Sequence, residues 1–161
     1  MIKRTIRRNN LLLLMTLLAS SAFAQMNEPV KLQKAADGKR IDIYIGGKFF
    51  TAFLYPDTLE KPVLYPLHSA AGTTVTRGFP ISPRAGEPTD HPHHLGLWFD
   101  YENVNGLDFW NNSYAIPAEK KHLYGWIKTD RIEKMADGNP GTLVYHANWT
   151  NQQGKVLLEE T

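Results

Sequence analysis

One short segment of the chain concentrates groups that could bind a metal ion or a substrate. Asp90-His91-Pro92-His93-His94 places a carboxylate beside three imidazoles. Both groups are ligands that zinc, copper, iron and manganese accept. Because Pro92 favours an extended conformation at His91, we expect the side chains of His91 and His93 on one face of the chain. The segment predicts either a divalent metal site, with His91 and His93 as ligands, or histidines that hydrogen-bond a substrate or a loop.

The residues that follow alternate in character, and in an unbroken strand alternate side chains share a face. One face would combine an imidazole, an indole and two carboxylates: His94, Trp98, Asp100 and Glu102. The other face would be apolar and is expected in the core: Leu95, Leu97, Phe99 and Tyr101. Sugars offer C–H faces that pack on tryptophan and hydroxyls that donate to carboxylates. The first face therefore predicts a saccharide site, and the alternative is an ordinary solvated face.

Two sets of candidate site residues follow. The candidate catalytic residues are Asp90, His93, His94 and Asp100. The candidate ligand-binding residues are Arg77, Trp98, Glu102, Asp108 and Trp110. Asp100 and Glu102 would lie about 6.5 Å apart at their Cα atoms along a strand. The carboxylates of glycosidases flank the scissile bond rather than standing side by side on one strand, so a glycosidase pair is the weaker interpretation.

A bend is needed if the histidines and the tryptophan are to line one pocket. His93 and Trp98 fall on opposite faces of a continuous strand. Pro92 and Gly96 offer places where the strand could be interrupted. We therefore predict a bulge or kink near Gly96 that brings the histidines beside Trp98 and Asp100.

The elements that must position these residues are β-strands. Residues 40–45 alternate with period two, Gly46-Gly47 supplies a turn, and residues 48–55 return as the second strand of a hairpin. Asn105-Gly106 favours a type I′ turn that pairs Val104 with Leu107. Further strands are expected at 62–68, 73–79, 123–132, 142–150 and 155–160, with a loop at 80–90 and a helical turn at 117–122. The pattern predicts an all-β fold, an antiparallel β-sandwich.

The N-terminus has the form of a secretory signal peptide. Four basic residues precede an apolar run at 11–19, and Ala22-Phe23-Ala24 ends the segment. We predict cleavage after Ala24 and a periplasmic or secreted protein without a membrane span after cleavage. Removing residues 1–24 takes away four of the 18 Lys and Arg and none of the 16 Asp and Glu, which leaves 137 residues with a formal charge of −2. Nucleic acid is therefore not an expected partner.

The remaining chain is expected to form part of one domain. The length of 161 residues allows a single domain at most, and the absence of cysteine excludes disulfides. We interpret residues 25–40 as a lead-in and residues 41–161 as the β domain. Because the chain stops inside an apolar strand, we expect this domain to be the N-terminal part of a larger one.

Several motifs carry a family resemblance: residues 66–67, 70–80, 90–94, 96–99 and 104–113. Together they resemble the PmoA-like family of exported bacterial proteins, which are often labelled methane oxygenase PmoA and otherwise classed as a domain of unknown function. The resemblance runs from about Ile41 to Thr161 and implies an all-β, sandwich-like domain whose relatives occur beside sugar-processing genes. The chain departs from the family pattern at His68, at Glu102-Asn103 and at Thr129, where a histidine is usual.

Three functions are compatible with these residues. The leading hypothesis is a small-molecule or saccharide ligand, bound or processed outside the cytoplasm around His91, His93, His94, Trp98 and Asp100. The second is a metal-dependent, oxygenase-like enzyme with a divalent metal as cofactor, as the family label implies. The third is a non-catalytic interaction domain.

Overall fold

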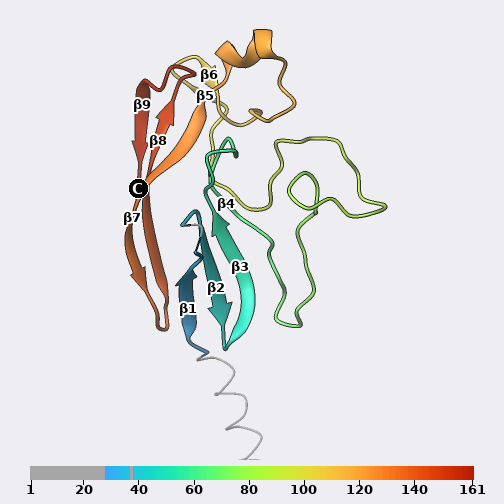
Figure 1. Cartoon of the computed structure of the whole chain (residues 1–161), viewed down its shortest axis with the longest axis vertical. Coiled ribbons are helices and arrows are strands. Elements are labelled where there is room, and N and C mark those ends of the chain that lie inside the picture. The colour runs from blue at the N-terminus through green and yellow to red at the C-terminus, as the bar shows by residue number, and fades with distance from the viewer. Residues whose placement is uncertain (1–27, 37) are drawn as a thin grey trace, which may run out of the picture.

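The computed structural model describes residues 28–36 and 38–161, and this part of the chain is an all-β structure of three antiparallel sheets (Figure 1). The all-β prediction is therefore confirmed. The predicted signal peptide, residues 1–24, lies outside the described residues. Within the described part, none of the helical structure has the length and apolar character that crossing a membrane requires.

The first sheet is a meander of four strands: β1 (Val30–Lys34), β2 (Arg40–Ile45), β3 (Lys48–Leu54) and β4 (Val63–Leu64). The predicted hairpin is confirmed, because Ile45 pairs with Lys48 and both turn glycines have positive φ. β1 lies in the segment that was expected to be a lead-in. Its Val30 and Leu32 alternate with polar residues, which is the strand signal in this segment.

The second sheet is the predicted short hairpin of β5 (Asn103–Val104) and β6 (Leu107–Asp108). Val104 pairs with Leu107, and φ is 52° at Asn105 and 84° at Gly106, as a type I′ turn requires. The third sheet has the order β7 (Trp126–Ala136), β8 (Thr142–Thr150) and β9 (Val156–Glu160). A 3₁₀ helix, η1 (Ala118–Leu123), precedes it where a helical turn was expected.

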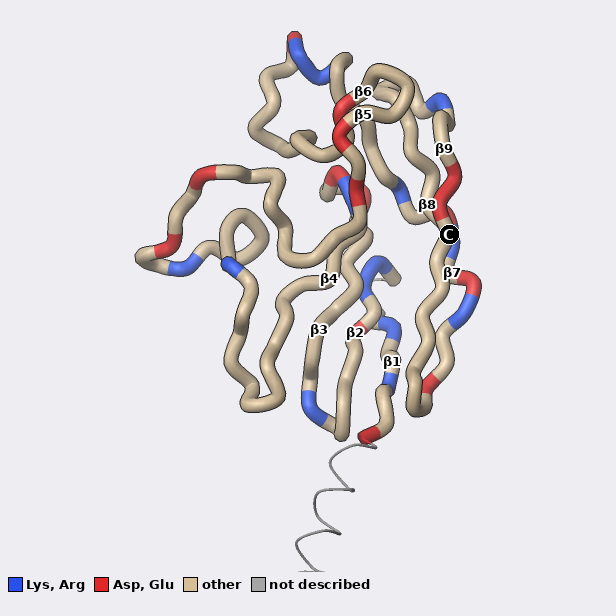
Figure 2. Tube along the Cα trace, turned by 180° about the vertical axis from the view of Figure 1, so that it is seen from behind, with Lys and Arg blue, Asp and Glu red and all other residues tan. Residues whose placement is uncertain are grey.

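Two expected strands are largely missing. Of residues 62–68 only Val63–Leu64 forms a strand, and the segment 73–79 contributes a single bridge between Thr74 and His68. Pro62 and Pro66 supply no N–H group to a ladder, which limits the strand. The long connection from β4 to β5 consequently leaves the sheets on one side of the molecule (Figures 1 and 2).

The first and third sheets share a core. Three buried residues form the first-sheet side of this core: Ile41 of β2, Phe53 of β3 and Tyr55 directly after β3. They pack against partly buried residues of β7 and β8, which are Ile132, Met135, Leu143 and Tyr145. The rings of Phe53 and Tyr145 are 4.7 Å apart at their centroids. The edge of β1 also meets the β7–β8 turn, where Val30 bridges Gly138. This contact joins the sheets, while closure into a sandwich stays a prediction.

The segment after the histidines is bent. Gly96 has φ of 90°, and a Cβ atom there would lie 2.7 Å from the carbonyl oxygen of Leu64. The predicted kink near Gly96 is thus confirmed, and Leu97 then forms a bridge with Leu64 at the edge of β4.

From Leu97 to Tyr101 the faces of this segment are opposite to the prediction. Leu95 is buried, but Leu97, Phe99 and Tyr101 have exposed fractions of 52%, 66% and 65%. The expectation that these three side chains lie in the core is wrong for the described structure. The physical reason is an ion pair formed on the inward side, where the carboxylate of Asp100 meets the buried ammonium of Lys61.

Candidate functional site

A buried ion pair lies beneath the candidate site. Lys61 Nζ is 2.7 Å from Asp100 Oδ2, and both side chains are fully shielded from solvent. The ammonium also donates to the carbonyl oxygens of Trp110, at 2.6 Å, and Phe109, at 3.2 Å. Asp100 Oδ1 accepts the backbone N–H of Tyr101, whereas Oδ2 has no regularly oriented hydrogen bond and is held by the charge of Lys61. Asp100 is therefore enclosed rather than presented to solvent.

Burial shifts both members of this pair toward their neutral forms. It lowers the pKa of Lys61, and the attraction of Asp100 opposes that shift. It raises the pKa of Asp100, which Lys61 in turn opposes.

The three histidines of the predicted cluster do lie together. The ring centroids of His93 and His94 are 4.3 Å apart, and His91 stacks on His94 at 5.1 Å. Arg77 donates to Asp90 at 3.0 Å and to the carbonyl oxygen of His91 at 2.9 Å. His91 has φ of 49°, an uncommon conformation for a residue with a side chain. Arg77 thus anchors the turn that carries the cluster.

Burial favours the neutral form of two of these imidazoles. Burial, with smaller contributions from His94, Lys61 and His91, lowers the pKa of His93 to about 4, and Asp108 opposes the shift. Burial also lowers the pKa of His94. A neutral imidazole offers one donor and one acceptor, which suits an uncharged hydroxylated ligand.

An aromatic row extends from the histidines. The centroid of Trp98 is 5.7 Å from that of His94 and 5.6 Å from that of Trp110. Lys61 Nζ lies 5.3 Å from the Trp98 ring centroid, within cation–π range. Trp98 Nε1 is buried and has no hydrogen-bond partner, whereas the Trp110 side chain is among the exposed large hydrophobic groups. Trp110 is therefore the tryptophan of this pair that offers the larger accessible surface to a ligand.

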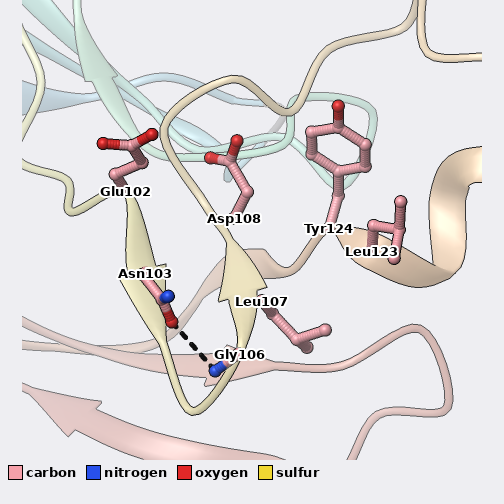
Figure 3. A pocket seen from close by; sticks show the side chains of 7 residues that line it. All are labelled: Glu102, Asn103, Gly106, Leu107, Asp108, Leu123 and Tyr124. Carbon is pink, nitrogen blue, oxygen red and sulfur yellow. Dashed lines mark hydrogen bonds between the residues drawn. The ribbon is translucent and has the colours of Figure 1, made fainter.

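Two predicted ligand-binding carboxylates line the same pocket. A pocket of about 500 Å³ is lined by Glu102, Asn103, Gly106, Leu107, Asp108, Leu123 and Tyr124. Figure 3 shows the carboxylates of Glu102 and Asp108 and the phenol of Tyr124 pointing to the same side of the β5–β6 hairpin. Asp108 is held by Asn111, whose backbone and side-chain nitrogens donate to its two oxygens at 2.9 and 2.8 Å. Figure 2 likewise shows acidic residues at this hairpin.

Asp108 links the pocket to the histidine cluster. It acts electrostatically on His93, Lys61 and Asp100. The predicted residues therefore fall into an exposed histidine turn, an aromatic row, and a pocket with Glu102 and Asp108, while Asp100 lies beneath them.

Sequence reasoning missed Lys61 and Tyr124. Lysine is almost never fully buried unless paired, so its type predicted an exposed position. The available signal was its place two residues before the apolar strand β4. Tyr124 follows η1 and enters the pocket through a bridge to Asp108, a contact between distant segments.

The metal prediction for His91 and His93 has no further support from the arrangement of side chains. Across residues 28–36 and 38–161, no three His, Cys, Asp or Glu side chains are grouped so that they could hold a metal ion. The rings of His91 and His93 are 5.7 Å apart at their centroids, in an edge-on contact.

Fold and site together define an all-β protein with a pocket of acidic and aromatic side chains beside a histidine turn. Residues 40–161 match the model of a family of unknown function, DUF6807, and the chain belongs to this family. No curated protein and no solved structure matches the chain.

Proposed function

We propose that this protein binds an uncharged saccharide in the pocket between the β5–β6 hairpin and Tyr124. The observation that carries the proposal is that Glu102, Asp108 and Tyr124 line one pocket of about 500 Å³ and point their polar ends to the same side (Figure 3). Ligand pockets span about 300–1,000 Å³ and combine apolar walls with a few polar groups. Leu107 and Leu123 supply the apolar wall here.

The chemistry of the pocket fits a sugar. Carboxylates accept hydrogen bonds from hydroxyl groups, and such charge-assisted bonds are stronger than neutral ones. Because Asn111 already fixes Asp108, little side-chain freedom is lost when a ligand binds. The exposed face of Trp110 offers a surface for a sugar C–H face next to the segment that forms the pocket.

The cellular setting belongs to the same proposal. A signal peptide cleaved after Ala24 would place the binding pocket outside the cytoplasm, where saccharides are available. The resemblance to the PmoA-like family supports this setting, since its relatives are exported and occur beside sugar-processing genes.

A non-catalytic interaction domain is the second candidate. Leu97, Phe99 and Tyr101 present large exposed apolar side chains on one stretch of chain. Leu97 and Phe99 also border an apolar groove of about 420 Å³ that reaches Phe53 and Tyr145. Exposed apolar patches of this kind are typical of contact surfaces.

An array of neutral mono- and oligosaccharides, followed by calorimetry on the ligands it identifies, tests the leading proposal. We expect binding by the unmodified protein and a loss of about 10- to 100-fold in affinity for Glu102→Gln and for Asp108→Asn, since a hydrogen bond to a charged group contributes about 1.5–3 kcal/mol. Glu119→Gln, in η1 outside the pocket, is the control and should bind normally. An array without any bound saccharide, or equal affinity in all variants, would overturn the proposal.

A further inference from the structure

We infer that Lys61 is the positioning residue of the proposed saccharide pocket, because its ammonium ties together both ends of the hairpin that carries the pocket carboxylates. The inference rests on the proposed function for the ligand, but the positioning itself is a property of the protein before any ligand binds.

The three polar contacts of Lys61 lie at the base of the β5–β6 hairpin. Asp100, on the incoming side, is two residues before Glu102, and its Oδ2 lies 2.7 Å from Lys61 Nζ. On the outgoing side, Lys61 donates to the carbonyl oxygens of Phe109 and Trp110, directly after Asp108. One cation therefore joins the two chain segments from which both pocket carboxylates project.

The backbone on both sides of Lys61 is held by neighbouring strands. The carbonyl oxygen of the preceding Glu60 accepts the N–H of Ile127 in β7 at 2.9 Å. On the other side, Val63 of β4 is buried in the core cluster with Tyr65 and Leu95. The first and third sheets thus fix the backbone on either side of Lys61. The ammonium of Lys61 in turn holds the two segments at the base of the hairpin.

The chemistry of the contact explains why a lysine is used. An ammonium group has three N–H donors, and here three oxygen atoms of two segments surround it. A methionine of similar length would fill the space but would leave the carboxylate of Asp100 and two carbonyl groups without their cation. Breaking one side of a buried pair is strongly destabilising, whereas replacing both partners with apolar residues is often neutral or stabilising.

The difference between removing one partner of the ion pair and removing both allows the positioning role of Lys61 to be tested apart from its effect on stability. Lys61→Met should lower stability and loosen the hairpin. The double variant Lys61→Met with Asp100→Leu removes both buried charges and leaves only the carbonyl oxygens of Phe109 and Trp110 without their donor. It should therefore be more stable than Lys61→Met alone, remain folded, and still lack the tie between the two segments.

Lys128 provides a matched control. It is a partly buried lysine that, like Lys61, donates to two carbonyl oxygens, those of Asp57 at 2.7 Å and Leu59 at 2.9 Å. It lies 3.8 Å from the ring centroid of Trp126. Its contacts do not include the β5–β6 hairpin, so Lys128→Met tests the loss of a buried lysine as such.

The experiment compares these variants of the full chain by NMR amide exchange without ligand and by binding to the same array of neutral saccharides. The reporters are the amides of Gly125 and Asn111, which donate to the backbone and side chain of Asp108 at 3.1 and 2.9 Å. We expect at least 10-fold faster exchange at both amides, a shifted Trp110 indole signal and at least 10-fold weaker binding in the double variant. Lys128→Met should change none of these readouts.

Unchanged exchange at Gly125 and Asn111 in a folded double variant would overturn the positioning role. Faster exchange in a series where even the unmodified protein binds no saccharide would support the positioning role and overturn the proposed function. Normal saccharide affinity despite a loosened hairpin would overturn the inference that Lys61 positions the pocket for its ligand.

Discussion

Single residues at the candidate site are governed by charge and burial. Lys61 and Asp100 are fully enclosed, and His93 is held neutral beside them. Burial of a charge is costly unless a partner compensates it. The site therefore combines one compensated ion pair with imidazoles that remain uncharged at neutral pH, which favours hydrogen bonding with uncharged hydroxyl groups over attraction of an anion.

The histidine makes stability depend on pH in a defined window. The pKa of His93 is lowered from 6.5 to about 4 in the folded protein, so the unfolded chain binds a proton at a higher pH than the folded one. Stability should therefore fall as pH decreases from about 6.5 to about 4 and change no further from this group below that range. His93→Gln should lose this part of the pH dependence.

Urea unfolding of the unmodified protein and of His93→Gln across pH 4 to 7.5 measures this pH dependence of stability. An NMR titration of the His93 ring gives its pKa directly. His122, an exposed residue in η1, offers the control substitution His122→Gln. A normal pKa for His93 would contradict the account that burial lowers the pKa of this imidazole.

At the scale of elements, the site depends on two local devices. The Asn105-Gly106 turn sets the hairpin with Glu102 and Asp108, and the bend at Gly96 turns the histidines toward Trp98. Gly96 is needed for two reasons, because it has φ of 90° and because a Cβ atom would press on the carbonyl oxygen of Leu64.

Gly96→Ala should therefore destabilise the protein by more than backbone strain alone. Gly86 is a suitable control, since it has φ of 82° but a Cβ atom there would meet no neighbouring atom within 4 Å. We expect about 1 kcal/mol for Gly86→Ala and about 2–3 kcal/mol for Gly96→Ala in urea unfolding. Equal losses in the two variants would show that the contact with Leu64 is unimportant.

These elements also show what sequence can predict. The turns at Gly46-Gly47 and Asn105-Gly106 follow from local chemistry, and both hairpins were predicted, the second of them with its pairing of Val104 and Leu107. The alternation of polar and apolar residues after Gly96 was also visible in the sequence, but the sequence did not show which of the two faces lies inward. Trp98 and Asp100 take the inward side because of Lys61, and such a contact between distant segments leaves no periodicity in the sequence.

At the scale of the whole molecule, the first and third sheets depend on a shared apolar core. Phe53 of β3 is buried and lies 4.7 Å from Tyr145 of β8 and 5.3 Å from Tyr55, measured between ring centroids. Lys61 is anchored to both sheets through its neighbours. The geometry of the pocket is therefore coupled to the packing of the sheets.

Phe53→Ala should reduce the free energy of unfolding by about 3–5 kcal/mol, as large-to-small changes of buried aromatic residues do. Phe99→Ala removes an equally large but mostly exposed ring and should stay within about 0.5 kcal/mol. Calorimetry on both variants measures this contrast. A similar loss in both would contradict the assignment of the core to the contact between the sheets.

The central claim is that the pocket at the β5–β6 hairpin binds a saccharide. A ¹⁵N-HSQC titration of the unmodified protein with the strongest saccharide of the array tests it most directly. We expect saturable shifts concentrated on Glu102, Asp108 and Tyr124, with the Trp110 indole among them. Shifts concentrated instead on Leu97 and Phe99, or no shifts at millimolar saccharide, would contradict the claim.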